Sequence, residues 1–256
     1  MITTYNQAKI TAVNDDCLDY MAYIPDRSID MILCDLPYGT TACKWDVIIP
    51  FEPLWEHYNR IIKDNGAIVL FGAEPFSSML RLSNISMYKY DWIWDKIKGT
   101  GFLNAKKQPM RNHEIISVFY KNQCNYYPQK TSGHVRKKTF RAKNLQTDVY
   151  GNMNSDYTYD STERYPRSIQ EFSTDTQNSS LHPTQKPVAL CEYLIQTYTK
   201  ENEIVLDNCM GSGSTGIACM NTNRQFIGIE KNVNFFNIAV RRLSSHKVQK
   251  KLEFNY

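Results

Sequence analysis

Residues 204–216 read Ile-Val-Leu-Asp-Asn-Cys-Met-Gly-Ser-Gly-Ser-Thr-Gly, an apolar run followed by an acid and a glycine-rich turn. We predict a strand at Ile204–Leu206 and a helix at Ser214–Met220. Glycines allow a tight turn and close approach of a ligand to the backbone, and the helix start offers free N–H groups. The next strand, Phe226–Ile229, ends at Glu230, whose carboxylate can accept hydrogen bonds from ribose hydroxyls. These features predict a site for an adenosine-containing cofactor.

The same loop also matches the dinucleotide fingerprint, since Gly211, Gly213 and Gly216 have the spacing G-x-G-x-x-G. A nicotinamide-dependent oxidoreductase is therefore an alternative. That fingerprint usually opens the first βαβ unit, whereas only about forty residues follow the loop here. Asp207, directly before the loop, also suits a cofactor with cationic groups better than a pyrophosphate. S-adenosylmethionine, which carries an ammonium and a sulfonium, meets that requirement.

A second candidate site follows the apolar run Ile29–Cys34, which we predict to be a buried strand of a parallel sheet. The next four residues are Asp35-Leu-Pro-Tyr38. Ligands of open α/β sheets bind beyond the carboxyl ends of the strands. There an acid and the carbonyls beside a proline can accept N–H bonds from an amino group on a flat ring, and a tyrosine can stack on that ring. An ordinary exit from a strand has the same pattern, so the tetrapeptide alone leaves both interpretations open.

Apolar runs and helical periodicity alternate on both sides of a polar middle segment, which predicts an α/β fold with a parallel sheet. Before the middle segment we also expect strands at Lys9–Val13, Ala67–Phe71, Tyr90–Trp94 and Glu114–Tyr120, with helices at Pro53–Lys63 and Pro75–Leu82. After it we expect two further helices, at Val188–Lys200 and Val233–Ser244. The middle segment, 121–181, is rich in Asn, Ser, Thr, Asp, Tyr and Lys, which predicts a loop-rich insertion with a function of its own.

The insertion contains a run of basic residues without an acid: Lys130, Arg136, Lys137, Lys138, Arg141 and Lys143. Tyr126, Tyr127 and Phe140 lie beside or within this run. Basic side chains interleaved with aromatic ones suit a nucleic-acid backbone with occasional base stacking. A solvated surface loop explains the same residues, so the run alone does not decide.

Several classes of protein do not fit the 256-residue chain. No apolar stretch approaches the roughly 18 residues that span a bilayer, so we expect no contact with a membrane. The N-terminus has neither the basic start nor the apolar core of a signal peptide. The seven cysteines are far apart and include no C-x-x-C pair, which suits buried thiols better than disulfides or zinc. We therefore expect a cytoplasmic protein without a metal.

Four motifs in this order resemble those of the β class of amino-methylating DNA methyltransferases, in which the catalytic tetrapeptide precedes the cofactor loop. Asp35-Leu-Pro-Tyr38 is similar to the family's Asp-Pro-Pro-Tyr, and Asp207-Asn-Cys-Met-Gly-Ser-Gly-Ser-Thr215 to its Asp-x-Phe-x-Gly-Ser-Gly-Thr-Thr. His182-Pro-Thr-Gln-Lys-Pro187 matches the family's segment, and Asp16-Cys-Leu18 resembles its contact to the cofactor adenine. Leu36, Cys209 and Ser214 depart from the family pattern, but none of these changes removes a group that the reaction needs.

The resemblance covers about residues 9–120 and 182–243. It implies an α/β, Rossmann-like fold that binds S-adenosylmethionine, in circularly permuted order, with a mostly parallel seven-stranded sheet and a loop-rich insertion. Residues 1–120 would form the catalytic half of the core, 121–181 a target-recognition insertion, and 182–256 the cofactor-binding half.

The resemblance also implies roles for individual residues. Asp35 and the carbonyl of Leu36 would accept hydrogen bonds from the exocyclic amine beside Pro37, and the amine would attack the methyl group directly. Tyr38 would stack on the flipped-out base. The cofactor would contact Asp16, Cys17, Asp35, Thr184, Lys186, Asp207, Asn208, Gly211, Ser212, Gly213, Thr215 and Glu230. The DNA would contact Lys96, Lys130, Arg136, Lys137, Lys138, Arg141 and Lys143.

The implied activity is site-specific methylation of N6 of adenine in DNA, because a leading Asp in the tetrapeptide favours adenine in this family. A leading Ser favours N4 of cytosine, and N4-cytosine methylation stays open. So does methylation of protein glutamine, whose similar tetrapeptide usually begins with Asn. A catalytically silent DNA-binding module should have lost Asp35 or the glycine loop, and neither is lost. The implied partners are double-stranded DNA, a second copy of the chain and a cognate restriction endonuclease.

Overall fold

The computed structural model describes residues 3–7, 9–40, 43, 46–141, 145–147, 151–153, 157–174 and 185–246. The chain divides into two compact units. The core unit comprises Met1–Tyr127 and Ser168–Tyr256, and the insertion unit comprises Pro128–Arg167. No helix within the described ranges has the length and apolar character needed to cross a membrane.

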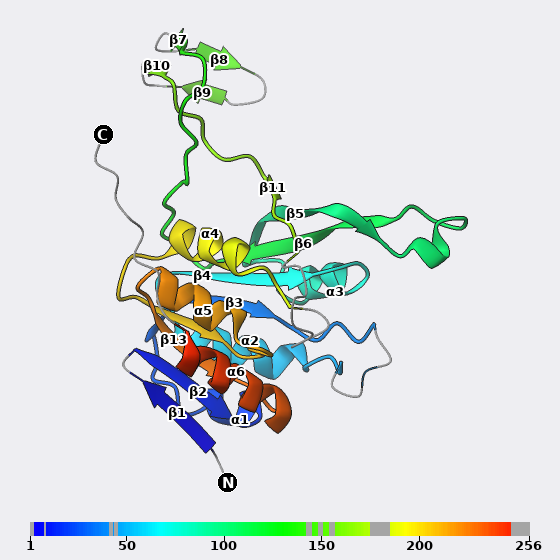
Figure 1. The fold of residues 1–256 in the computed structure, drawn as a ribbon. Coiled ribbons are helices and arrows are strands. Elements are labelled where there is room, and N and C mark those ends of the chain that lie inside the picture. Colours follow the sequence, from blue (N-terminus) through cyan, green and yellow to red (C-terminus); the bar gives the residue numbers. More distant parts are fainter. Residues whose placement is uncertain are drawn as a thin grey trace. The chain divides into compact units, whose positions relative to one another are not determined.

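The core unit is built on a nine-stranded, mostly parallel sheet with the strand order β1-β2-β13-β12-β3-β4-β6-β5-β11 (Figure 1). Its strands are β1 (Thr3–Gln7), β2 (Ile10–Asn14), β3 (Ile29–Asp35), β4 (Ile62–Gly72), β5 (Tyr88–Thr100), β6 (Arg111–Phe119), β11 (Ile169–Glu171), β12 (Ile204–Asp207) and β13 (Gln225–Ile229). The five strands from β2 to β4 are parallel to one another, and β6 is antiparallel to both β4 and β5. The inner seven strands are those predicted, and β1 and β11 extend the two edges.

Helices cover both faces of this sheet because side chains alternate along its central strands. Met31 and Leu33 of β3 face a core formed with α4 (Val188–Tyr198), α5 (Ser214–Asn221) and α6 (Val233–Ser245). Ile32 and Cys34 face the opposite core, formed with α1 (Cys17–Met21), α2 (Phe51–Ile61) and α3 (Phe76–Ser83). A strand buried on both faces has a continuous apolar sequence, which is why β3 was recognisable.

All seven predicted strands and all five predicted helices are present, but two strands are much longer than predicted: β4 covers Ile62–Gly72 instead of Ala67–Phe71, and β5 covers Tyr88–Thr100 instead of Tyr90–Trp94. The helix predicted at Pro53–Lys63 begins at Phe51 and ends at Ile61, because Ile62 already belongs to β4. The five-residue helix α1 was not predicted, since it is too short to show a helical period. The short helix η1 (Phe102–Asn104) was not predicted either.

The insertion unit contains two small antiparallel sheets. One pairs β7 (Lys137–Arg141) with β10 (Tyr157–Ser161), and the other pairs β8 (Leu145–Thr147) with β9 (Gly151–Met153). The ends of the predicted 121–181 insertion belong to the core unit instead. The backbone N–H of Asn125 donates to Asn65 O at 2.9 Å, and β11 pairs with β5.

Candidate active site

A cavity of about 680 Å³ opens at the carboxyl ends of four parallel strands. Residues at or within two positions of the ends of these strands line it: Asp16 after β2, Asp35 at the end of β3, Asp207 at the end of β12 and Glu230 after β13. Its volume lies within the roughly 300–1,000 Å³ typical of sites for small molecules. Sheet topology therefore brings the tetrapeptide and the glycine loop to one place, although they are far apart in the sequence.

The tetrapeptide forms one wall of this cavity. The Tyr38 hydroxyl donates to Asp35 Oδ1 at 2.7 Å, and the Tyr38 ring stacks on Phe76 at 5.0 Å between centroids. Leu36 is buried, so it anchors the turn in the core that contains α2 and α3. The chain thus fixes the directions of the Asp35 carboxylate and the Tyr38 ring before any ligand binds.

Asp46 holds the loop after the tetrapeptide, a role that no sequence signal indicated. Its carboxylate accepts hydrogen bonds from the backbone N–H groups of Gly39 at 2.8 Å and Thr40 at 2.9 Å. Gly39 has a φ of +67°, and a Cβ there would lie 2.9 Å from Ile48 Cγ1. The loop therefore needs glycine at this position and an acceptor opposite it.

Behind the tetrapeptide, four side chains of alternating charge form what we call the charge chain: Asp35, Lys186, Glu114 and Lys96. Lys186 Nζ lies 2.6 Å from Asp35 Oδ2 and 3.2 Å from Glu114 Oε2. Glu114 Oε1 in turn lies 2.5 Å from Lys96 Nζ. The chain joins the tetrapeptide to strands β5 and β6 through the segment that precedes α4.

The opposite charges of the charge chain stabilise one another. Burial alone would lower the pKa of Lys186, but the carboxylates of Asp35 and Glu114 outweigh it and raise that pKa to about 12. Burial would raise the pKa of Glu114, yet Lys186 and Lys96 lower it below its ordinary value. Burial and the nearby charge of Glu114 raise the pKa of Asp35, and the Lys186 ammonium and the Tyr38 hydroxyl act against that rise. Lys186 is therefore a fixed cation beside the tetrapeptide.

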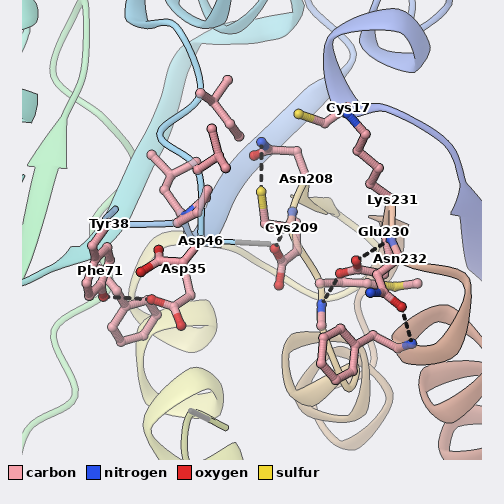
Figure 2. Close-up of a pocket in the computed structure, with 18 of the residues that line it drawn as sticks. Cys17, Asp35, Tyr38, Asp46, Phe71, Asn208, Cys209, Glu230, Lys231 and Asn232 are labelled. Atoms are coloured by element: carbon pink, nitrogen blue, oxygen red, sulfur yellow. Dashed lines mark hydrogen bonds between the residues drawn. The ribbon is translucent and has the colours of Figure 1, made fainter. Parts of the chain in front are cut away.

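The opposite wall carries the acids predicted to bind the cofactor. Glu230 accepts hydrogen bonds from the backbone N–H of Gly211 at 2.9 Å and of Asn232 at 2.8 Å. Figure 2 shows Asp35 and Tyr38 on one side of the pocket and Glu230 and Asn232 on the other. Burial raises the pKa of Asp207 to about 7, although hydrogen bonds from the Thr215 hydroxyl and the backbone N–H of Cys209 act against the rise.

Most of the residues predicted for the site line the cavity: Asp16, Cys17, Asp35, Leu36, Pro37, Tyr38, Lys186, Asp207, Asn208, Gly211, Ser212, Thr215 and Glu230. Gly213 is instead the N-cap of α5 with a φ of +80°, and a Cβ there would lie 3.3 Å from the Cβ of Ala239. Its contact with the cofactor stays a prediction. Thr184 lies outside the described residues.

The predicted DNA contacts are distributed over both units. In the core unit, Lys96 is paired with Glu114 and is mostly buried, so its contact with DNA stays a prediction. In the insertion unit, Lys130 pairs with Glu163 at 3.0 Å and Arg136 with Asp160 at 2.6 Å. Lys137 and Lys138 are exposed on β7. The side chain of Arg141 and the whole of Lys143 lie outside what the structure describes.

The described residues show neither a metal-binding cluster nor an activated thiol at the cavity. No cluster of three or more His, Cys, Asp or Glu side chains among the described residues could hold a metal ion. All seven cysteines are free thiols. A hydrogen bond to Cys209 and burial raise the pKa of Cys17, which lines the cavity, so its thiol stays protonated.

Comparison with known proteins identifies the family. The family model described as DNA methylase matches residues 29–241. The type II methyltransferase M.HpaI of Haemophilus parainfluenzae is 30% identical over 238 residues, which are 87% of this chain and 70% of that relative. The DNA adenine methyltransferase YhdJ of Escherichia coli is 28% identical over 93% of this chain and 83% of its own length.

Two solved structures show the same architecture. The crystal structure of the M1.HpyAVI–SAM complex is 25% identical with a TM-score of 0.62, covering 91% of this chain and 98% of that one. The cytosine-N4-specific PvuII DNA methyltransferase has a TM-score of 0.68 over 96% of this chain and 90% of its own, and at 15% identity it shows the fold alone.

The fold and the cavity define the class, which is the S-adenosylmethionine-dependent methyltransferases. The matches narrow this class: the chain belongs to the DNA methylase family that covers N6-adenine and N4-cytosine methyltransferases. Its methyl donor is S-adenosylmethionine and its substrate is DNA. The predicted fold class and cofactor are thereby confirmed.

Proposed function

We propose that this enzyme methylates N6 of adenine at a specific site in double-stranded DNA, by direct attack of a base flipped out of the helix. The Asp35 carboxylate at the edge of the cavity carries this proposal. Tyr38 and Lys186 each donate to one of its oxygens, and the lone pairs that remain can accept an N–H bond from an exocyclic amine. The similarity to a relative named as an adenine methyltransferase supports adenine over cytosine.

The residues on the opposite wall fit the cofactor. When bound, S-adenosylmethionine supplies an electrophilic methyl group on a sulfonium. Glu230 keeps lone pairs for ribose hydroxyls while it holds Gly211 and Asn232. Asp207 is a buried carboxylate with a pKa of about 7, and a cation beside it would favour its ionised form. These acids would hold the ribose and the cationic amino-acid end of the cofactor.

The tetrapeptide would orient and polarise the base. Asp35 and the Leu36 carbonyl would accept the two N–H groups of the amine, which draws its lone pair out of conjugation with the ring. The Asp35 carboxylate also stabilises the positive charge that develops on the nitrogen during attack. Tyr38, fixed by Phe76 and by its hydrogen bond to Asp35, would stack on the base.

The insertion unit would read the target sequence. Residues 128–167 contain eight Lys and Arg against four Asp and Glu, an excess equal to the net charge of +4 of the whole chain. The core unit is therefore neutral overall, and the net positive charge that attracts DNA lies in the insertion unit. A homodimer and a cognate restriction endonuclease stay predictions.

Modified-base sequencing tests this function. DNA from a methylation-free host that expresses the wild type should carry N6-methyladenine at one sequence motif. Asp35→Ala should abolish the signal, whereas Asp64→Ala, which changes an exposed acid of the same unit, should leave it intact. N4-methylcytosine at the motif would overturn the choice of base. Unmethylated DNA together with a methylated protein would overturn the function itself.

A further inference from the structure

Strands β5 and β6 continue beyond the neighbouring strand β4 as a hairpin, which we call the β5–β6 arm and define as residues 97–111 (Figure 1). Thr100 pairs with Arg111, and the loop between them contains the short helix η1. Every residue of the arm is exposed. The structure thus builds a regular, projecting element that makes no contribution to the core.

The tip of the arm is apolar. Phe102 is 78% exposed and Leu103 is 97% exposed, and Ile97 and Met110 are exposed below them. Neither tip residue belongs to a hydrophobic cluster within the described part of the chain. Large apolar side chains gathered on a projecting element mark a surface that binds something.

The rest of the arm is basic. Lys98, Lys106, Lys107 and Arg111 carry its charge, and no Asp or Glu occurs between Lys96 and His113. None of these four cations forms an ion pair with a carboxylate in the described ranges. Because the core unit is neutral overall, four unpaired cations on one hairpin are a strong local excess of positive charge.

The base of the arm is tied to the catalytic cavity. Lys96 directly precedes the arm, and Glu114 lies three residues beyond its other end. Both belong to the charge chain that reaches Asp35 through Lys186, and Glu114 also lines the cavity. The arm therefore starts beside the cavity in which the target base would bind.

We propose that the β5–β6 arm is a second DNA-binding element, separate from the insertion unit. Lys98, Lys106, Lys107 and Arg111 bind phosphates, and Phe102 and Leu103 insert into the base stack of the duplex. When apolar side chains flanked by cations insert between bases, the free-energy cost of unstacking is offset by the additional contacts that the deformed duplex makes with the protein. The inference rests on the proposed function, since it takes duplex DNA as the substrate. Two copies of the arm would repel each other, which disfavours self-association as its role.

Two arm variants and one control test the proposal. The tip variant is Phe102→Ala with Leu103→Ala, and the charge variant is Lys106→Ala with Lys107→Ala. The control, Tyr23→Ala, removes an aromatic side chain that is 74% exposed elsewhere in the core unit. Each protein is assayed for methylation of unmethylated plasmid DNA, native and heat-denatured, and for binding to duplex DNA at several salt concentrations.

The tip variant should bind and methylate duplex DNA about tenfold less well, because it loses contacts with the base stack. Its activity on denatured DNA should stay within about twofold of the wild type, since there is no stack to open. The charge variant should lower the slope of log binding constant against log salt by about two, or about one per lost phosphate contact. The control should match the wild type in every assay.

Three results would overturn the proposal while leaving the function intact. In the first, the wild type methylates DNA, and both arm variants bind and methylate duplex DNA as well as the wild type does. The second is a tip variant that loses as much activity on denatured DNA as on duplex. The third is a dimer of the free protein, seen by sedimentation, that the tip variant dissociates, which would make the arm a self-association surface. A wild type that methylates no DNA would instead overturn the proposed function first.

Discussion

The charge chain of the core unit pairs cations with acids in the interior, whereas the ion pairs of the insertion unit lie in water. Lys186 lies between Asp35 and Glu114 with 8% of its side chain exposed. Arg136 binds Asp160 with 73% of its side chain exposed. A buried ion that loses its partner remains uncompensated in a medium of low dielectric, whereas water compensates an exposed one. The same bond therefore fixes geometry in the core unit and only adjusts the surface charge of the insertion unit.

Removing the central cation of the charge chain should have the largest effect. Lys186→Met leaves Asp35 and Glu114 as neighbouring, mostly buried carboxylates, so we expect the free energy of unfolding to fall by about 3–5 kcal/mol and methylation to disappear. Urea unfolding and methylation of plasmid DNA measure both. Lys130→Met is the exposed counterpart and should leave the unfolding midpoint unchanged. Equal unfolding midpoints for the two variants would show that the buried ion pair contributes no more to stability than the exposed one.

Glu114→Gln should have the next largest effect, because it keeps the shape of the side chain and removes one charge. Lys186 would then be held by Asp35 alone and could shift with it. We expect kcat to fall by about tenfold to a hundredfold, the usual consequence of displacing a reacting geometry. Cofactor affinity measured by calorimetry should change little. A loss of affinity with an unchanged kcat would instead place Glu114 at the cofactor.

The same variant should show a distinct dependence of stability on pH. Lys186 and Lys96 outweigh burial and hold the pKa of Glu114 below its ordinary value of about 4.3. A carboxyl group with a depressed pKa stabilises the folded state above its unfolded pKa, and this contribution is lost as the pH falls through the folded value. The wild type should therefore lose stability below about pH 4.3 more steeply than Glu114→Gln does.

Much of the core could be predicted because its signals are local. The apolar run of β3 and the glycine turn before α5 each show their structure within about ten residues, and both sites lie at strand ends where ligands bind. The charge chain could not be predicted. Glu114 meets Lys186 only because β6 joins the sheet beside β4, and no local pattern encodes that pairing.

Strands β5 and β6 also could not be predicted fully from local sequence. Lys96 has the sequence context of a DNA contact, yet the antiparallel pairing of β5 with β6 places it beside Glu114. The pairing also decides that the segment after Lys96 projects as a hairpin, whereas its sequence shows only a polar, basic stretch. Long-range register, not residue type, separates the buried cation from the exposed ones.

Asp207 provides a smaller and reversible test of the core unit. Burial raises its pKa to about 7, so its ionised fraction grows as the pH rises through neutrality. Because the ionised form attracts the cationic end of the cofactor, affinity for S-adenosylmethionine should rise about eightfold from pH 6 to 7.5. It should fall again above about pH 8, where an α-amino group loses its proton. In Asp207→Asn, calorimetry should find weak cofactor binding at every pH, without the increase between about pH 6 and 7.5. A wild-type affinity that does not change with pH would contradict this role of Asp207.

The smallest effect should distinguish paired from unpaired cations of the insertion unit. Lys137 and Arg136 are adjacent, but only Arg136 is paired with a carboxylate of the described residues, that of Asp160. A cation that binds a phosphate releases counterions, and one that is already neutralised releases fewer. Lys137→Ala should lower the salt slope of duplex binding, followed by fluorescence anisotropy, by about one, and Arg136→Ala by less than half of that. Equal slopes would show that DNA displaces Asp160 from Arg136. In that case Asp160 competes with the DNA phosphate for Arg136, and Asp160→Asn should tighten binding. DNA could not displace the partners of Lys186 in the same way, because they lie in the interior of the core unit.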